Sequence, residues 1–442
     1  MDNTLAYIDQ ASFLGFRALG RGPVPQVLWI YEHPVNLDNL RQFHRNLGHG
    51  LLGRRIERSP VPFGRDRWVA DRGPDLDIAT IPRARSEALD WADEQIRRPL
   101  DPERGPSWRL AVQPFTEGGA AVSLVASHSV VDGGGLHLAA ANALEGVAHD
   151  LGYPPPGSRP LGRAVREDLW QAARAVPDMA KAVAATIRVA RKSRDELATS
   201  AGRSAPRKRL DGDAPATVPT VVVHIPEGPW DQRAEDLGGT SNSLFAGIAA
   251  KVGQLQGRVD QDGMVKLAFP VSERTEGDTR ANALSGMTVT VDPKTVTTSL
   301  REIRAELKRG LTDLAETRND LLAPLPLTPL VPARLARMLE GMALGSGMPV
   351  GCSNVGQLHP ALNRPDGTDA ELLVARQSES RITTEILERM AGVMFCASVR
   401  VNGIVVFTVS AWQPGADNSR DHLVETVTGA LDQFGLTGTV VA

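Results

Sequence analysis

Cysteine is scarce in this chain, whose 442 residues include two of them. Two thiols cannot build the disulfide framework of a small secreted domain, and so low a content favours a reducing compartment. The N-terminal stretch Met1–Gln10 is acidic and lacks the basic-then-apolar pattern of a signal peptide. We therefore expect a cytoplasmic protein.

Long apolar runs are also missing. The best candidate for a membrane span, 393–412, is interrupted by Arg400, Asn402 and Gly403, whereas a span needs roughly 20 apolar residues. The net charge of −3 gives no global reason to bind nucleic acid or an anionic membrane. What remains is an ordinary globular composition, in a chain long enough for about two or three domains.

Two hairpins stand out among the predicted elements. Strands at 108–115 and 120–127 are joined through glycines, and strands at 391–401 and 404–412 are joined by Asn402-Gly403, a strong hairpin signal. Helical patterns flank both hairpins. The sequence therefore predicts an α+β fold whose halves form related α/β sandwiches, with a site between them.

The stretch Ala126-Ser-His-Ser-Val-Val-Asp-Gly-Gly-Gly135 is the most informative part of the first half. It follows an apolar strand pattern at 120–126, and a helical pattern opens at Leu136 and is expected to end at Gly152. A strand that ends at His128 and turns through glycines holds an imidazole from both sides. A general base is positioned in this way.

Three interpretations of His128 compete. It can be an ordinary core histidine, a metal ligand together with Asp132, or a general base. The metal interpretation lacks an HExxH or CxxC partner in the sequence. Asp132 can also act simply as the N-cap of the helix that follows. Spacing alone leaves these alternatives open.

Two other segments have both a functional and a structural interpretation. Residues 162–198 predict one or two helices that run into a basic stretch ending at Arg209. That stretch either attracts the phosphates of a pantetheine donor or an acidic carrier protein, or is a solvated linker. The apolar, proline-punctuated segment 321–344 lines an acyl pocket, rests on a membrane surface, or packs in the core.

The residues around His128 resemble a known superfamily. His128-Ser-Val-Val-Asp132-Gly133 matches the HxxxDG signature of chloramphenicol acetyltransferase-like proteins. These include nonribosomal peptide synthetase condensation domains, polyketide-associated acyltransferases, and wax ester synthase/diacylglycerol acyltransferases. Further stretches resemble that superfamily in the right order and extend the match over nearly the whole chain: 99–110, 234–245, Pro270-Val-Ser-Glu-Arg274 followed by Asn282, and Ser353-Asn354-Val-Gly356.

The resemblance implies two acetyltransferase-like α/β sandwich lobes that form a V-shaped pseudo-dimer around a central channel, with the histidine at its middle. The lobes would comprise residues 1–160 and 216–442, joined by a helical crossover and basic linker at 161–215. The resemblance also implies that Asp132 is structural and pairs with Arg274 of the other lobe. A bidentate pair of this kind would hold the bend of the histidine loop.

The implied activity is acyl transfer from a thioester to a hydroxyl or amine, with the histidine as general base. The donor would be acyl-CoA or a phosphopantetheinyl acyl carrier protein, and the acceptor a small molecule or a lipid. Candidate groups for the oxyanion are the backbone of Gly133 and Gly134, or the side chains of Ser353 and Asn354. No metal or redox cofactor is needed. A peripheral membrane contact fits a lipid substrate, and nucleic acid is not an expected partner.

Three departures from the superfamily pattern qualify this interpretation. Ser127 stands where a first histidine is usual, which weakens assignment as a wax ester synthase. Ala281 replaces the usual glycine beside Asn282, a substrate-binding candidate whose simpler role is structural. The sequence has no adenylation or carrier domain, so it would act in trans. The alternative function is a catalytically silent condensation-like module that binds a carrier protein and recruits partners, although silent relatives usually lose the histidine or aspartate.

Overall fold

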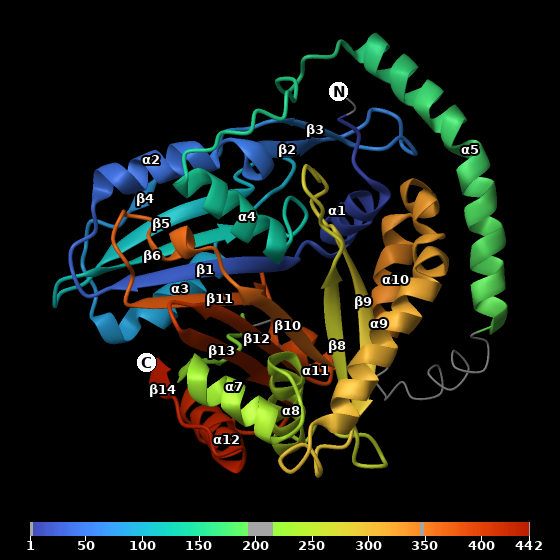
Figure 1. Ribbon diagram of the computed structural model, residues 1–442. Coiled ribbons are helices and arrows are strands. Elements are labelled where there is room, and N and C mark those ends of the chain that lie inside the picture. Colours follow the sequence, from blue (N-terminus) through green and yellow to red (C-terminus); the bar gives the residue numbers. More distant parts are fainter. Residues whose placement is uncertain (1–2, 193–214, 345–348, 442) are drawn as a thin grey trace.

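The computed structural model describes residues 3–192, 215–344 and 349–441, and it contains two large sheets covered by helices (Figure 1). The predicted basic linker around Arg203 to Arg209 lies outside the described residues. Within the described ranges, no helix is both long enough and apolar enough to cross a membrane.

The N-terminal lobe is built on a five-stranded sheet. Its first hairpin forms as predicted, with antiparallel strands on either side of the glycine turn. The edge strand pairs in parallel with its neighbour. The spatial order of the strands is β11 (Leu372–Glu379), β1 (Pro23–Tyr31), β6 (Ala120–Ala126), β5 (Trp108–Pro114) and β4 (Asp77–Ile78).

Helices cover both faces of this sheet, so the side chains of strand β1 are buried on both sides. Trp29 of β1 meets Phe43 of α2 (Leu37–Leu47) edge to face, with ring centroids 6.1 Å apart. The neighbouring Gln26 points the other way and donates to the carbonyl of Ala92 in α3 (Ala88–Arg97). This alternation follows from the two-residue period of a strand. Helix α4 (Gly133–Leu144) packs beside α2 on the first face.

The C-terminal lobe is built on a seven-stranded mixed sheet. Its second hairpin turns at Asn402 and Gly403, whose φ angles of 49° and 76° meet the requirement of a two-residue hairpin turn. The spatial order of the strands is β14 (Thr439–Val441), β7 (Thr220–Pro226), β13 (Ile404–Trp412), β12 (Val393–Val401), β10 (Val350–Gln357), β8 (Val265–Ser272) and β9 (Leu284–Val291).

Helices α7 (Glu227–Asp236), α8 (Ser241–Leu255) and α12 (Arg420–Gln433) bury the apolar face of the C-terminal sheet. Helix α8 begins in a capping box. The Thr240 hydroxyl accepts from the N–H of Ser243, and the Ser243 hydroxyl accepts from the N–H of Thr240. Helix α9 (Arg301–Leu322) packs against β9. Both cysteines lie in this core as free thiols.

A loop between β8 and β9 reaches the N-terminal lobe and positions the site. It comprises residues 273–283, called here the bridging loop. Its backbone contacts α1 (Tyr7–Leu19) and the turn before α4. Figure 1 shows the β8–β9 hairpin rising between the lobes toward these two elements.

The division into lobes at residues 161 and 216 stays a prediction. One strand from beyond this division nevertheless belongs to the N-terminal sheet. Strand β11, from the C-terminal half, completes the N-terminal sheet by pairing antiparallel with β1, from Pro23 opposite Glu379 to Ile30 opposite Leu372. Local sequence patterns give the strand but not its partner, since the pairing joins positions about 350 residues apart in the chain. The two lobes are therefore interlocked.

Other expectations are corrected by the structure. The helix after the histidine turn begins at Gly133 and ends at Leu144, not near Gly152, because Gly146 takes a left-handed φ of 71°. The crossover is one long helix, α5 (Leu161–Lys192). Strands β2 (Arg54–Glu57) and β3 (Arg67–Ala70) were not predicted, because four-residue strands give little periodicity.

Candidate functional site

The turn that carries His128 is fixed by backbone hydrogen bonds from both sides. The N–H of His128 donates to the carbonyl of Pro23 at the start of β1, at 3.1 Å. The N–H of Ser127 donates to the carbonyl of Ser107 at 2.8 Å, and the carbonyl of Ser127 accepts from Val130 and Val131. The histidine backbone therefore sits at a defined strand end, as the sequence predicts.

The Asp132 carboxylate forms the junction between the turn, the helix and the bridging loop. One oxygen accepts from the N–H of Gly135 at 2.6 Å, so Asp132 is the N-cap of α4. The other accepts from the N–H of Ala283 at 2.8 Å and from Arg274 at 2.9 Å. All of these donors are buried or nearly so, and the carboxylate is occupied in holding the bend.

The expected contact between Asp132 and Arg274 is present, with both side chains more than nine-tenths buried. It is not bidentate, however. Nη2 of Arg274 meets Asp132 Oδ2, while Nη1 donates to the carbonyls of Asp278 and Arg280. The guanidinium thus ties its own loop together and presents one nitrogen to the other lobe.

Asn282 connects the bridging loop directly to the histidine residue. Its side-chain amide donates to the carbonyl of His128 at 3.2 Å, and its backbone N–H donates to Asp9 Oδ1 at 2.8 Å. Asn282 is 4% exposed. It therefore positions the histidine backbone, in agreement with its simpler, structural interpretation.

Two buried charges beneath the loop were missed at the level of sequence. Asp9 of α1 is fully buried and accepts from the N–H groups of Ala281 and Asn282. Arg54 of β2 is also fully buried; it donates to the carbonyl of Val130 at 3.0 Å and lies 4.0 Å from the centroid of the Trp68 ring. One feature of the sequence could have indicated that Asp9 is buried. It lies four residues before the core residue Phe13, and therefore on the apolar face of the same helix.

Burial sets the protonation of this cluster. It raises the pKa of Asp9, against the opposing charge of Arg54 and the hydrogen bonds from the loop. It lowers the pKa of His128, against the charge of Asp132 and a hydrogen bond between the imidazole and the Asn282 side chain. His128 is partly exposed, and its lowered pKa leaves the imidazole neutral at neutral pH. A neutral imidazole is the form that accepts a proton.

The remaining predicted site residues fall into two places. Gly133 and Gly134 open α4, where backbone N–H groups point out of the helix end. Ser353 and Asn354 instead lie on strand β10, whereas the superfamily stretch that they resemble is a loop. Asn354 donates to Asn242 at 3.1 Å, within the C-terminal lobe. Among the described residues, no hydrogen bond brings Ser353 or Asn354 to the histidine turn.

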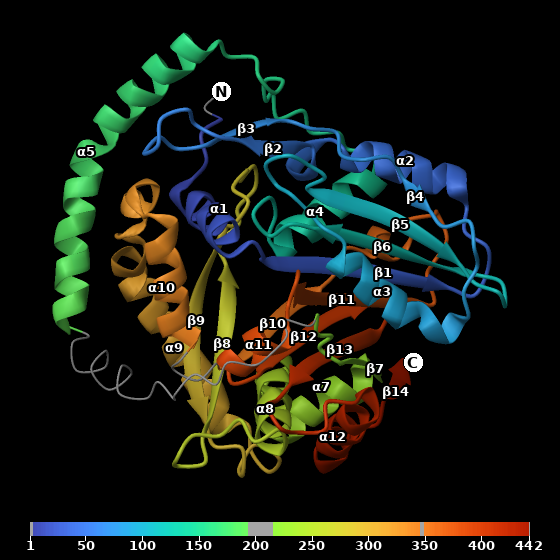
Figure 2. The same ribbon diagram turned by 180° about the vertical axis from the view of Figure 1, so that it is seen from behind.

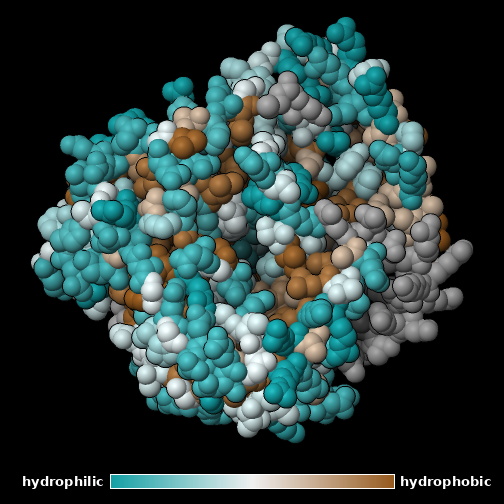
Figure 3. Space-filling view, viewed as in Figure 1, coloured by the Kyte–Doolittle hydropathy of each residue, from teal (hydrophilic) through white to brown (hydrophobic). Residues whose placement is uncertain are grey.

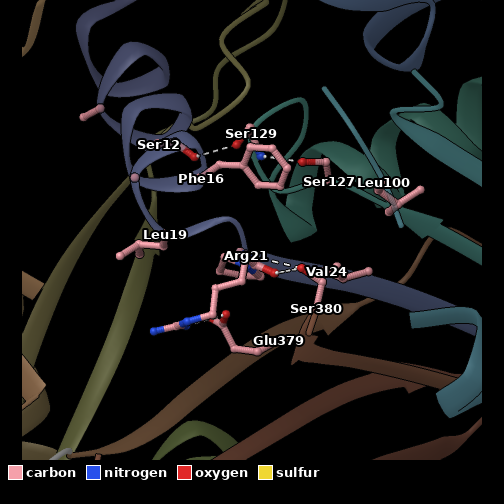
Figure 4. A pocket seen from close by; sticks show the side chains of 14 residues that line it. Ser12, Phe16, Leu19, Arg21, Val24, Leu100, Ser127, Ser129, Glu379 and Ser380 are labelled. Atoms are coloured by element: carbon pink, nitrogen blue, oxygen red, sulfur yellow. Dashed lines mark hydrogen bonds and ion pairs between the residues drawn. The ribbon is translucent and has the colours of Figure 1, made fainter. Parts of the chain in front are cut away.

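A cavity of about 220 Å³ lies beside the turn (Figure 4). Ser127 and Ser129 line it, whereas His128 between them does not. Ser12 of α1 faces Ser129 across the cavity, with the two hydroxyls 3.5 Å apart. The ion pair of Arg21 with Glu379 closes its lower side in this view. No residue of the apolar segment 321–344 is part of the described lining.

The glycine of this turn that is most tightly packed is Gly135. A Cβ placed there would lie 2.8 Å from Val131 Cγ2 and 3.0 Å from both Arg274 Nη2 and Asp132 Oδ1. At Gly133 it would meet nothing within 4 Å. Gly135→Ala should therefore destabilise the protein by about 1–3 kcal/mol, as overpacking does.

Urea denaturation of Gly135→Ala and Gly133→Ala measures this difference. The second variant is the matched control, since it adds the same methyl group to the same helix end in open space, and its stability should equal or exceed that of the wild type. Equal losses in the two variants would contradict the packing described here.

The fold thus combines two interlocked α+β lobes with an HxxxDG turn at the place where the lobes meet. The chain has the fold of the chloramphenicol acetyltransferase-like superfamily, and the resemblance suggested by the sequence is confirmed at the level of the fold. No protein-family model matches the chain. Solved structures and one pair of sequence relatives support the assignment.

The sequence relatives are two strain versions of a Mycobacterium tuberculosis protein with the provisional name diacylglycerol O-acyltransferase. They are 25% identical to this chain over 351 residues, which cover 69% of the chain and 67% of the relative.

Three solved structures share the fold. Their sequence identities to this chain are low, so the likeness is one of fold. The wax ester synthase/diacylglycerol acyltransferase of Marinobacter aquaeolei VT8 is 15% identical, with 98% of this chain and 100% of that one covered and a TM-score of 0.54. TRI101 of F. sporotrichioides, solved with coenzyme A and T-2, is 12% identical, with full coverage of both chains and a TM-score of 0.56. The nonribosomal peptide synthetase FmoA3 is 19% identical with a TM-score of 0.53; the match covers 98% of this chain and 44% of the FmoA3 chain.

Proposed function

We propose that the protein is an acyltransferase that moves an acyl group from a thioester to a hydroxyl or amine, with His128 as the general base. The observation that carries the proposal is His128, a half-buried residue whose imidazole is kept neutral at neutral pH by burial, on a turn held by both lobes. The names of the relatives support the class of reaction: one is a wax ester synthase/diacylglycerol acyltransferase, and another was solved with coenzyme A.

The proposed reaction transfers one proton twice. The His128 imidazole takes the proton of the acceptor hydroxyl or amine while the acceptor attacks the thioester carbonyl carbon. The tetrahedral intermediate collapses as the carbon–sulfur bond breaks, and the imidazolium returns the proton to the leaving thiolate. The products are an ester or amide and a free thiol. The acceptor, the thioester and the His128 imidazole account for every atom and proton of the reaction, so no other reactant is needed.

The developing oxyanion requires donors near the histidine turn. The N–H groups of Gly133 and Gly134 are the candidates that the geometry favours, because they open α4 five and six residues after the base and lie at the positive end of the helix dipole. Ser353 and Asn354 are the weaker candidates, given their place on β10.

The donor is proposed to be acyl-CoA or a phosphopantetheinyl acyl carrier protein, and the acceptor a small or lipid alcohol or amine. The cavity beside Ser127 and Ser129 offers room next to the turn for part of one substrate. Four serine hydroxyls around it favour a polar group there: Ser12, Ser127, Ser129 and Ser380.

Thiol release tests the proposal. The full chain is incubated with acyl-CoAs of graded chain length and with acyl carrier protein, in the presence of diacylglycerol, fatty alcohols and amines; free thiol is measured, and products are identified by mass spectrometry. We expect acceptor-dependent thiol release with at least one donor. If a carrier protein binds but no thioester is consumed faster than in buffer, the protein is a silent carrier-binding module and the proposal is wrong.

A further inference from the structure

Helix α5 has an unusual distribution of large and small side chains. The side that faces the protein consists mainly of alanines, namely Ala164, Ala175, Ala182 and Ala185, each at most 9% exposed. The acid on this side, Asp168, is fully buried and pairs with Arg67 and Arg159. The helix is thus anchored to the body by small residues and one ion-pair cluster.

The large apolar side chains of α5 face solvent instead. Leu169, Val176 and Val183 follow each other at intervals of seven residues, so they lie in one row along the helix, and Ile187 continues the row one turn later. Their exposed fractions are 46%, 57%, 46% and 48%. An amphipathic helix normally buries such a row. We call these four residues the apolar row.

Basic residues outnumber acids on α5. The helix sequence contains seven lysines and arginines and three acids, whereas the whole chain has a net charge of −3. Four of the basic residues are exposed along the part of the helix whose side chains are described: Arg163, Arg166, Arg174 and Lys181. Trp170 is 58% exposed and has the guanidinium of Arg174 3.3 Å from its ring centroid. A tryptophan with an adjacent cation is a side-chain pair suited to the boundary between lipid and water.

The position of α5 leaves this side open. Figures 1 and 2 show the helix along the outer edge of the molecule, next to α10 (Ala333–Leu344) and with no described element outside it. In Figure 3, tan and brown atoms appear along the same edge. Leu330 and Met338, 50% and 56% exposed, add apolar surface on the elements beside it.

We propose that α5 is an interfacial helix that binds an anionic lipid surface, with the apolar row inserted among the acyl chains and the exposed basic residues of α5, such as Arg166 and Arg174, on the lipid phosphates. Length, amphipathic character and basic charge match helices that lie in the plane of a membrane. Charge complementarity favours this occupant: anionic lipid matches the excess of basic residues on α5, whereas two copies of α5 packed against each other would place like charges together. The inference does not depend on acyl transfer, because α5 contributes no residue to the histidine turn.

Vesicle flotation of the full chain tests the proposal. We expect binding to vesicles of phosphatidylcholine mixed with phosphatidylglycerol, and about ten-fold weaker binding to phosphatidylcholine alone. Binding should fall as salt rises from about 0.1 M to about 1 M, because the screening length shortens from about 10 to about 3 Å. The double variant Val176→Glu/Val183→Glu should lower the bound fraction about ten-fold.

A matched control places the same chemical change elsewhere. Leu255→Glu/Val259→Glu replaces two aliphatic residues that are 47% and 41% exposed and lie away from α5; it should float like the wild type. If the apolar-row variant fails to fold, the variant Arg166→Glu/Arg174→Glu is used instead, since both residues are exposed. This variant should bind less to the anionic vesicles, and its weak binding to phosphatidylcholine should stay unchanged.

Two results would overturn the proposal. One is a wild-type chain that stays unbound with anionic vesicles, or variants of α5 that float as well as the control. The other is a wild-type dimer in sedimentation analysis that Val176→Glu/Val183→Glu converts to monomer, which would assign the apolar row to a second copy of the chain.

Discussion

Replacing Arg274 by alanine is expected to lower the free energy of unfolding by about 3–5 kcal/mol. The change removes the charged partner of Asp132, whose side chain is 5% exposed, and leaves that carboxylate buried beside one helix cap and one loop N–H. It also frees the carbonyls that Arg274 holds within the bridging loop. Urea denaturation, with the midpoint and slope compared to the wild type, measures the loss.

Arg280 provides the matched control for Arg274. It is an arginine of the same loop, but its side chain is 33% exposed and its partner Asp278 belongs to that loop rather than to the N-terminal lobe. Arg280→Ala should cost less stability than Arg274→Ala, because no group at the lobe contact loses its partner and the N–H of residue 280 can still donate to Asp278. If the two variants lose the same stability, the Asp132–Arg274 contact does not hold the lobes together as described.

Replacing His128 by alanine is expected to lower kcat/KM for acyl transfer by about 10²–10⁴-fold, which is the contribution of a positioned general base. The fold should remain, because the turn is fixed by the backbone N–H and carbonyl of His128, and the ring adds only a hydrogen bond with the Asn282 side chain and the charge interaction with Asp132. The thiol-release assay gives the rate, and thermal unfolding of the same preparation shows that the variant is folded.

His422 serves as the control histidine, since it is exposed on α12 in the other lobe. His422→Ala should leave kcat/KM unchanged. A His128→Ala enzyme with the wild-type rate and an intact fold would remove the histidine from the mechanism, and would return it to the interpretation as an ordinary core residue.

The parts of the fold predicted from sequence are those that local chemistry determines. The Asn402-Gly403 turn follows from the need for two positive φ angles. The strand that delivers His128 follows from an apolar run, broken by Ser123 alone, between two glycine-rich turns. In each case the residues that specify the element are its neighbours in the chain.

The parts that were missed depend on residues far apart in the chain. Strand β11 joins the N-terminal sheet through pairing with β1, which no local pattern encodes. Asp9 and Arg54 were not singled out because their roles arise only when the bridging loop, about 270 residues further along from Asp9, reaches them. The Asp132–Arg274 contact was expected through the resemblance alone, and its single-nitrogen geometry depends on loop carbonyls that the sequence does not reveal.

The pH dependence of kcat/KM tests most directly whether a neutral His128 imidazole takes the acceptor proton. Burial lowers the pKa of His128 below its ordinary value of 6.5, so the base form persists to lower pH than for a free histidine. The rate should be constant above pH 6.5 and fall as pH drops through the lowered pKa, and this fall should be absent from the residual activity of His128→Ala. A decline centred above pH 6.5, or the same decline in His128→Ala at an undiminished rate, would contradict the account.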